Sequence, residues 1–154
     1  DIWGLKYDSD LAGVIARKNV PCCLMHNRKE PDYTDFIADF LKDMQETIDI
    51  AKKAGIADEN IILDPGVGFG KTYENNLEII NKLECMHALG YPILLGTSRK
   101  SVIGLTLDLP ADQRMEGTVA TTVIGVMKGV AFVRVHDVKE NYRALKMTEA
   151  ILGR

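Results

Sequence analysis

The side chains that could do chemistry in this sequence are one carboxylate, Asp64, and a group of cations at the ends of other predicted strands. The cations are Lys100, Arg134 and His136, with Arg99 and Arg28 as further members. An ionised carboxylate accepts paired hydrogen bonds from a guanidine-like N–H edge, whereas arginine and protonated histidine suit a phosphate. One acid among several cations therefore indicates a small molecule with two unlike ends.

Asp64 closes a short apolar run and is followed at once by Pro65 and the glycines Gly66, Gly68 and Gly70. This pattern predicts a buried strand that ends in a carboxylate at a flexible loop. In α/β proteins such a strand end is where polar groups for a small ligand lie, although an isolated Asp-Pro-Gly is also typical of a turn cap. The glycine spacing fits neither the phosphate-loop nor the dinucleotide motif, so both are excluded.

Arg134 and His136 are two residues apart on a predicted strand, and this spacing places their side chains on the same face. Ser101, at the start of a predicted helix, would add backbone N–H groups suited to a carboxylate or a phosphate. The alternative for Arg134 and His136 is a pair of polar residues inside a barrel, each paired with an acid.

Other polar residues in these segments are assigned ordinary structural roles. We expect Lys71 to be solvated and His26 to cap a strand. Arg114, Glu116 and Thr118 could face a ligand, but we assign them to a helix surface.

Four strand-and-helix units in alternation would position these residues. Apolar periodicity predicts strands over 20–25, 61–64, 92–96 and 130–136, and helices over 11–16, 33–51, 75–89, 101–105, 119–127 and 139–152, the first capped by Asp8 or Ser9. Nearly continuous apolar strands between helices indicate a parallel sheet covered by helices. Polar clusters after all four strands predict a site on the carboxyl face of a (βα) barrel or doubly wound sheet, of which this chain holds about half a barrel's eight units.

The composition fits one soluble globular domain: 154 residues, of which 46% are apolar and 27% charged. The formal charge of −3 argues against a nucleic-acid surface. No run approaches the length of a membrane span and no basic hydrophobic leader is present, so we expect a cytoplasmic protein. Cys22, Cys23 and Cys85 lack disulfide or metal spacing and are expected to be reduced thiols. Because the chain begins at Asp1 in what reads as the middle of an element, we expect a fragment of a longer protein.

Three segments together resemble the dihydropteroate synthase family: DPGVGFGKT at 64–72, GTSRKS at 96–101 and RVHDV at 134–138. LMHNR at 24–28, NNL at 75–77 and RMEGT at 114–118 match the same family in the same order. The resemblance spans essentially the whole chain, and the ordered set is more specific than any single motif.

The resemblance implies a (βα)8 TIM barrel, here about its C-terminal half, with residues 1–154 forming one pterin-binding domain. It implies a transferase of folate biosynthesis that joins 6-hydroxymethyl-7,8-dihydropterin pyrophosphate to p-aminobenzoate, giving 7,8-dihydropteroate and pyrophosphate. It further implies sulfonamides as competitive ligands, Mg²⁺ on the substrate diphosphate, and a homodimer.

The resemblance also implies roles for individual residues. Asp64 would grip the aminopyrimidine edge of the pterin, and Lys100 would bond the far polar side of the ring. Arg134 would stack on the pterin and, with His136, bind the leaving pyrophosphate, so that Lys100, Arg134 and His136 form the catalytic set. The remaining substrate contacts would be Met25, Phe69, Gly96, Arg99 and Ser101, the last receiving the aminobenzoate carboxylate. Loss of pyrophosphate leaves a cationic pterin methylene, so no side-chain nucleophile is needed.

The family's first strands, with a metal-linked asparagine and the loops that close over the substrates, have no counterpart in this sequence. We therefore expect no metal site within these residues and little or no synthase activity from the 154 residues alone. One alternative is a pterin-binding methyltransferase domain, against which the predicted anion site argues. Another is a non-catalytic half-barrel that self-associates, because four strands leave two unpaired sheet edges.

Overall fold

The computed structural model describes all 154 residues and has four strands, each followed by a helix. The strands are β1 (Cys22–Met25), β2 (Ile61–Asp64), β3 (Leu94–Leu95) and β4 (Phe132–Val133). The helices are α1 (Leu11–Lys18), α2 (Phe36–Lys53), α3 (Tyr73–Asn81), α4 (Ser101–Leu107), α5 (Met115–Met127) and α6 (Val138–Leu152). Short 3-10 helices span Asp58–Asn60, Leu83–Leu89 and Ala111–Gln113.

The strands are parallel and follow one another in sequence order. β1 pairs with β2 so that Met25 lies opposite Asp64, and β3 pairs with β4 so that Leu95 lies opposite Val133. A parallel bridge between Leu63 and Ile93 joins the two pairs. The expected α/β class with parallel strands is confirmed, and the carboxyl ends of all four strands lie along one edge.

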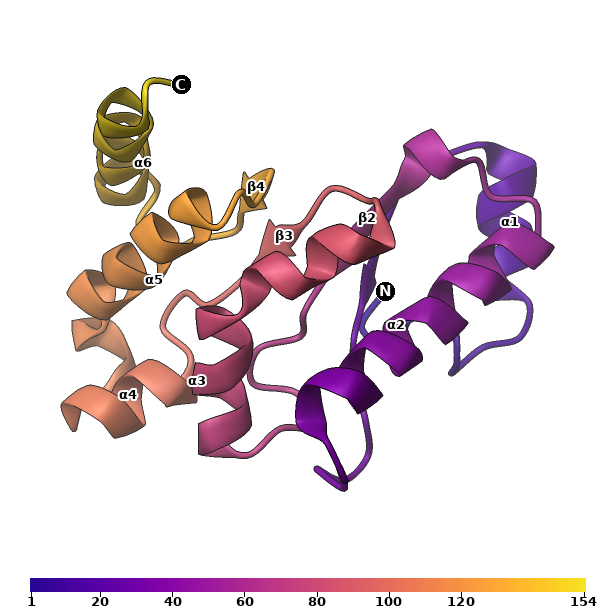
Figure 1. Ribbon diagram of the computed structural model, residues 1–154, viewed down its shortest axis with the longest axis horizontal. Helices are drawn as coiled ribbons and strands as arrows, with labels where there is room; N and C mark the ends of the chain where they lie inside the picture. Colours follow the sequence, from indigo (N-terminus) through magenta and orange to yellow (C-terminus); the bar gives the residue numbers. More distant parts are fainter.

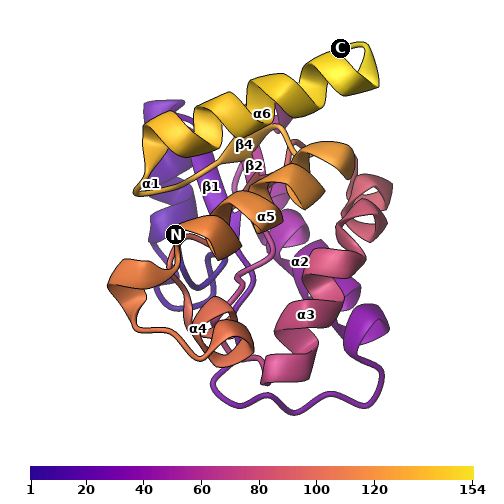
Figure 2. The same ribbon diagram turned by 90° about the vertical axis from the view of Figure 1, so that its left-hand side faces the viewer.

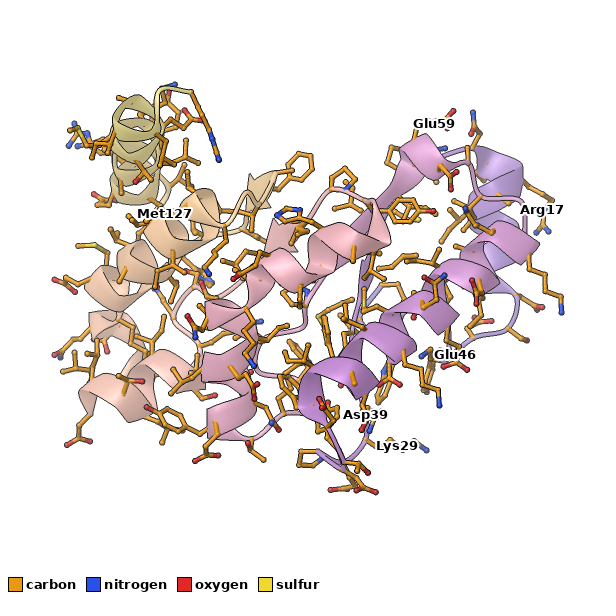
Figure 3. All side chains as sticks on the ribbon, in the orientation of Figure 1. Arg17, Lys29, Asp39, Glu46, Glu59 and Met127 are labelled. Atoms are coloured by element: carbon orange, nitrogen blue, oxygen red, sulfur yellow. The ribbon has the colours of Figure 1, made fainter.

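The molecule is an open strip in which β1 and β4 are not paired with each other. Figure 1 shows the strands in the middle of an elongated molecule, with α1 and α6 at opposite ends of its long axis. In the end-on view of Figure 2, α6 runs across the top of the molecule beside α5. The helices α3 and α2 lie on the side of α5 that faces away from α6. The charged side chains of Arg17, Glu46 and Glu59 point outward at the α1 end (Figure 3).

One hydrophobic core lies between the strands and the helices. Leu24 and Leu63 are fully buried and pack with Phe40, Met44 and other side chains of α2 and α3. Their strand neighbours on the other face, such as Ile62, remain partly exposed. Because successive strand side chains point to opposite faces, one face of the sheet is covered by helices and the other is more open.

Some predicted elements differ in extent from those observed. The N-cap of α1 is Asp10, not Asp8 or Ser9; the Asp8 side chain instead accepts a hydrogen bond from the Asp10 N–H at 2.8 Å. The single helix expected over 75–89 is divided, because α3 ends at Asn81 and a 3-10 helix follows. A 3-10 helix repeats every three residues, and this repeat buries both Leu83 and Met86 in the core.

Two further boundaries follow from local contacts. α2 begins at Phe36 because the Asp35 side chain caps it, accepting from the Ala38 N–H at 3.1 Å. The strand expected over 130–136 is reduced to Phe132–Val133, the two residues that pair with β3. None of the helices has the length and apolar character that crossing a membrane requires.

Candidate functional site

Asp64 ends β2 and is almost fully buried, with 3% of its surface exposed. One carboxylate oxygen accepts a hydrogen bond from the Gly66 N–H at 2.7 Å. Gly66 has a φ of +67°, and a Cβ at this position would collide with the carbonyl oxygen of His26, so the turn requires glycine. Burial raises the pKa of Asp64 above its usual value, against the opposing effects of the Gly66 N–H and of nearby positive charges.

Residues 65–71, the glycine loop, are held in place by side chains from other parts of the chain. Tyr33 donates its hydroxyl proton to the Gly70 carbonyl at 2.6 Å, and the Asn76 side chain accepts from the Gly68 N–H at 2.6 Å. The loop is therefore fixed from α3 on one side and from the segment before α2 on the other.

Lys100 connects the glycine loop to the end of β3. Its ammonium group donates a hydrogen bond to the Val67 carbonyl and lies 4.9 Å from the centre of the Phe69 ring. Burial lowers the pKa of Lys100 to about 8, an effect that the Asp64 charge partly opposes and the Arg134 charge reinforces. Lys100 is thus placed between the carboxylate and the other cations.

Lys71 and His26 belong to a partly buried network, so the solvated role expected for Lys71 is wrong, whereas His26 does follow the end of β1. The Lys71 Nζ lies 2.8 Å from Nδ1 of His26, which is only 2% exposed. On its other side, His26 Nε2 lies 3.0 Å from Asp43, which also accepts from Arg28 Nε at 2.6 Å. No local sequence pattern indicates these contacts, because the partners come from the end of β1, from α2 and from the glycine loop.

Arg134 follows β4, and its backbone N–H donates to the Leu95 carbonyl at 2.9 Å. This places its side chain beside Gly96. A Cβ on Gly96 would lie 3.3 Å from Nη2 and 3.5 Å from Nε of Arg134. The guanidinium group therefore occupies the space that the absent side chain leaves.

His136 is oriented by Ser98. The Ser98 Oγ accepts from the His136 backbone N–H at 3.1 Å and lies 2.9 Å from the ring Nδ1. Since the oxygen accepts from the backbone, its own proton is available to Nδ1. In the neutral ring the proton is then on Nε2, which can donate to an anion.

The predicted cations Lys100, Arg134 and His136 meet at one cavity of about 240 Å³, the anion cavity, whose other lining residues are Gly96, Ser98 and Val135. None of the lining residues is acidic. Asp64 is close enough for the Lys100 and Arg134 charges to act on its pKa, so the carboxylate and the cations are neighbours.

Apart from Gly96, the other predicted site residues do not line the anion cavity. Arg99 is paired with Asp137, with 2.6 Å between Nη2 and Oδ1, and Arg28 is paired with Asp43. Ser101 is exposed at the first position of α4, whereas Met25 is buried at the end of β1.

Two residues assigned to a helix surface instead hold the Arg99 backbone. Thr118 is fully buried and accepts from the Arg99 N–H at 3.1 Å, and Arg114 Nη1 donates to the Arg99 carbonyl at 2.9 Å. Arg99 has a φ of +59°, an uncommon conformation for a residue with a side chain. The helix-surface expectation is wrong for both residues, while Glu116 is exposed as expected.

The residues present do not form a magnesium site by themselves. No group of three or more histidine, cysteine, aspartate or glutamate side chains converges in the structure. Magnesium prefers oxygen ligands, and the charged side chains that line the anion cavity are basic.

Comparison with curated proteins gives relatives that include several dihydropteroate synthases. The chain is 65% identical to a dihydropteroate synthase of Clostridium beijerinckii over 155 aligned positions and 54% identical to that of Bacillus subtilis over 154. Both alignments cover all of this chain but only 58% and 54% of the relatives. The chain therefore spans little more than half the length of these proteins.

Solved structures agree in fold. A Clostridium difficile dihydropteroate synthase crystallised with pteroic acid superposes with a TM-score of 0.97 at 47% identity, covering all of this chain and 59% of that one. A Yersinia pestis dihydropteroate synthase with a pterin–sulfa conjugate gives 0.95 at 38% identity, covering all of this chain and 60% of that one. The four βα units thus correspond to part of a TIM barrel. Residues 1–136 match the family described as pterin binding enzyme, and the chain belongs to that family.

Proposed function

We propose that this chain is the pterin- and anion-binding part of a dihydropteroate synthase of folate biosynthesis. The reaction joins 6-hydroxymethyl-7,8-dihydropterin pyrophosphate to p-aminobenzoate and releases pyrophosphate. The observation that carries the proposal is the buried carboxylate of Asp64 beside a cavity lined by Lys100, Arg134 and His136. The names of the relatives support it, as do the solved structures of related synthases with pteroic acid and with a sulfonamide.

In this proposal the two ends of the substrate bind at different places. Asp64 accepts two N–H groups from the aminopyrimidine edge, while Lys100 bonds the far polar side of the ring. With Phe69, these residues form the pterin half-site. Met25 packs on the pterin, and Gly96, Arg99 and Ser101 contact the substrates from the end of β3, where Ser101 receives the aminobenzoate carboxylate and sulfonamides compete.

Departure of pyrophosphate is the step that the chain's cations assist. Arg134 and the Nε2 proton of His136 stabilise the negative charge that develops as the carbon–oxygen bond breaks. The pterin methylene, now cationic, then reacts with the weakly nucleophilic amine of p-aminobenzoate, which loses a proton as the carbon–nitrogen bond forms. Mg²⁺ is proposed only as a companion of the diphosphate, with protein ligands outside these residues.

We further propose that residues 1–154 form one pterin-binding domain of a cytoplasmic homodimer without a nucleic-acid partner. Large apolar side chains exposed on α5 and α6 support self-association: Met127, Tyr142, Met147 and Ile151. Figure 3 shows Met127 on α5 close to α6. Three free cysteines suit a reducing compartment, and the net charge of −3 disfavours a nucleic acid.

Binding of pteroic acid, measured by isothermal titration calorimetry, tests the pterin half-site. Asp64→Asn replaces one acceptor oxygen by a donor, so we expect affinity to fall about tenfold to a hundredfold. The matched control is Asp49→Asn, an exposed carboxylate on α2, which should bind as the unchanged protein does. Inorganic pyrophosphate should still bind to the Asp64→Asn protein. Equal pteroic acid affinity for Asp64→Asn and the unchanged protein would contradict the assignment.

A further inference from the structure

We propose that Lys71 is a positioning residue of the pterin half-site, which ties the glycine loop to the buried end of β1 and to α2. The inference rests on the proposed function, because it names a residue that acts on pterin binding without touching pterin. The inference explains why the Lys71 ammonium group lies inside the protein although no carboxylate accepts a hydrogen bond from it.

Three acceptors surround the Lys71 nitrogen. The Gly66 carbonyl lies at 3.1 Å, the Phe69 carbonyl at 3.0 Å and His26 Nδ1 at 2.8 Å. An ammonium group has three N–H donors and no acceptor, so the protonated side chain satisfies this set completely. The two carbonyls belong to the glycine loop, and the ring nitrogen belongs to the residue that follows β1.

The protonation of the network is consistent with this assignment. His26 Nε2 lies 3.0 Å from Asp43 Oδ2, so the proton of a neutral ring is on Nε2 and leaves Nδ1 free to accept from Lys71. Burial lowers the pKa of His26 to about 4, which keeps the ring neutral near pH 7. Burial acts to raise the pKa of Asp43, but hydrogen bonds from His26 and Arg28 outweigh it and hold the carboxylate ionised.

The charges around Lys71 come from every segment packed against it. Asp64 and Asp43 favour its protonated form, whereas Lys100 and Arg28 oppose it. Burial is the largest influence, and the resulting pKa of Lys71 is about 7 instead of the usual 10.5. Above this pH the amine has two donors for three acceptors, and one acceptor loses its partner.

Lys71 acts on ligand binding through Gly66 and Phe69, the two loop residues whose carbonyls accept its hydrogen bonds. Gly66 donates its N–H to the Asp64 carboxylate, and Phe69 lies under the Lys100 ammonium. Holding the carbonyls of these two loop residues therefore fixes both the carboxylate and the ring that the proposed function assigns to pterin. Neither Lys71 nor the glycine loop lines the anion cavity, which meets this connection only through the side chain of Lys100, so we expect loss of the Lys71 contacts to act mainly on pterin binding.

The test compares Lys71→Met with a matched control, Lys53→Met, an exposed lysine on α2. Pteroic acid and inorganic pyrophosphate are titrated separately by calorimetry. We expect Lys71→Met to weaken pteroic acid binding by about tenfold and to leave pyrophosphate affinity within about twofold. Equal loss for both ligands would indicate a general structural defect and would overturn the inference, as would unchanged pteroic acid affinity.

The pH profile gives a second readout that does not depend on a variant. Between about pH 6 and pH 7.5, below the titration of Lys100, pteroic acid affinity of the unchanged protein should fall as Lys71 loses its proton. The fall should be absent in Lys71→Met, and a profile of the unchanged protein that is flat over this range overturns the inference. If the unchanged protein does not bind pteroic acid at any pH, the proposed function itself fails, which is a different result.

Discussion

Arg134 depends for its position on a residue that has no side chain. Its guanidinium group lies against Gly96, with Nη2 3.3 Å from the place of a Cβ. The two residues are neighbours because β3 and β4 pair in parallel, with Leu95 opposite Val133 just before them. At this position a larger side chain and the observed guanidinium cannot occupy the same space.

A graded series at Gly96 should therefore reduce anion affinity in steps. Gly96→Ala places one carbon at tight contact distance, so the guanidinium shifts by a few tenths of an ångström and pyrophosphate binding weakens only slightly. Gly96→Val displaces the group from the anion cavity, and we expect about a tenfold loss. Calorimetry with inorganic pyrophosphate measures both. Full affinity in Gly96→Val would show that Arg134 does not need this position.

The sequence predicts the position of some site residues in the fold but not of others. Asp64 was placed correctly at a strand end because the apolar run before it and the Pro-Gly after it are local signals. Lys71 was assigned to solvent, since its acceptors His26 and Phe69 become neighbours only when β1 and the glycine loop pack together. Burial of a lysine by distant partners leaves no local pattern.

At the scale of elements, α5 sets the backbone that leads into α4. The Arg99 N–H is bound by the side chain of Thr118 in α5, and the Arg99 carbonyl by the side chain of Arg114, the N-cap residue of α5. Arg114 also donates to the Leu109 carbonyl at 2.9 Å. Since Lys100 follows directly, the position of its side chain in the anion cavity depends on a helix that contributes no residue to that cavity.

Arg114→Met should loosen this connection and weaken pyrophosphate binding by about threefold to tenfold, because two charge-assisted hydrogen bonds are lost. The matched control is Arg143→Met, an exposed arginine on α6, which should change nothing. Fluorescence or calorimetric titration of both proteins with pyrophosphate checks this. Identical affinities for the two variants would mean that α5 does not position the Arg99–Lys100 segment.

The helices and strands themselves were largely predictable, and the departures have local causes. The long apolar stripe predicts α2, and the predicted bounds of β2 are those observed, Ile61–Asp64. Hydrophobic period does not separate an α-helix from the 3-10 helix over Leu83–Leu89, because buried residues recur after three or four positions in both. The length of β4 depends on its partner β3, which no local pattern reveals.

At the scale of the whole molecule, the same edge of the sheet holds two lysines whose pKa values are lowered by burial. Lys71 is lowered to about 7 and Lys100 to about 8. In the unfolded chain both would titrate near their usual value of 10.5. Between the pKa of each lysine in the folded state and its pKa in the unfolded state, the unfolded chain binds more protons than the folded protein. The free energy of unfolding therefore rises with pH over this range.

Stability and pterin affinity should therefore change in opposite directions with pH. From about pH 7 to pH 9, loss of the buried Lys71 charge should raise the free energy of unfolding by about 2 kcal/mol, while the same loss weakens the hold on the glycine loop. Urea unfolding of the unchanged protein and of Lys71→Met at several pH values measures this increment. The difference between the two proteins removes the contributions of Lys100 and of the cysteines, which both proteins share. Parallel pteroic acid titrations give the affinity. If the unchanged protein and Lys71→Met gain the same stability over this range, Lys71 is not titrating inside the folded protein, and its place in the network has to be revised.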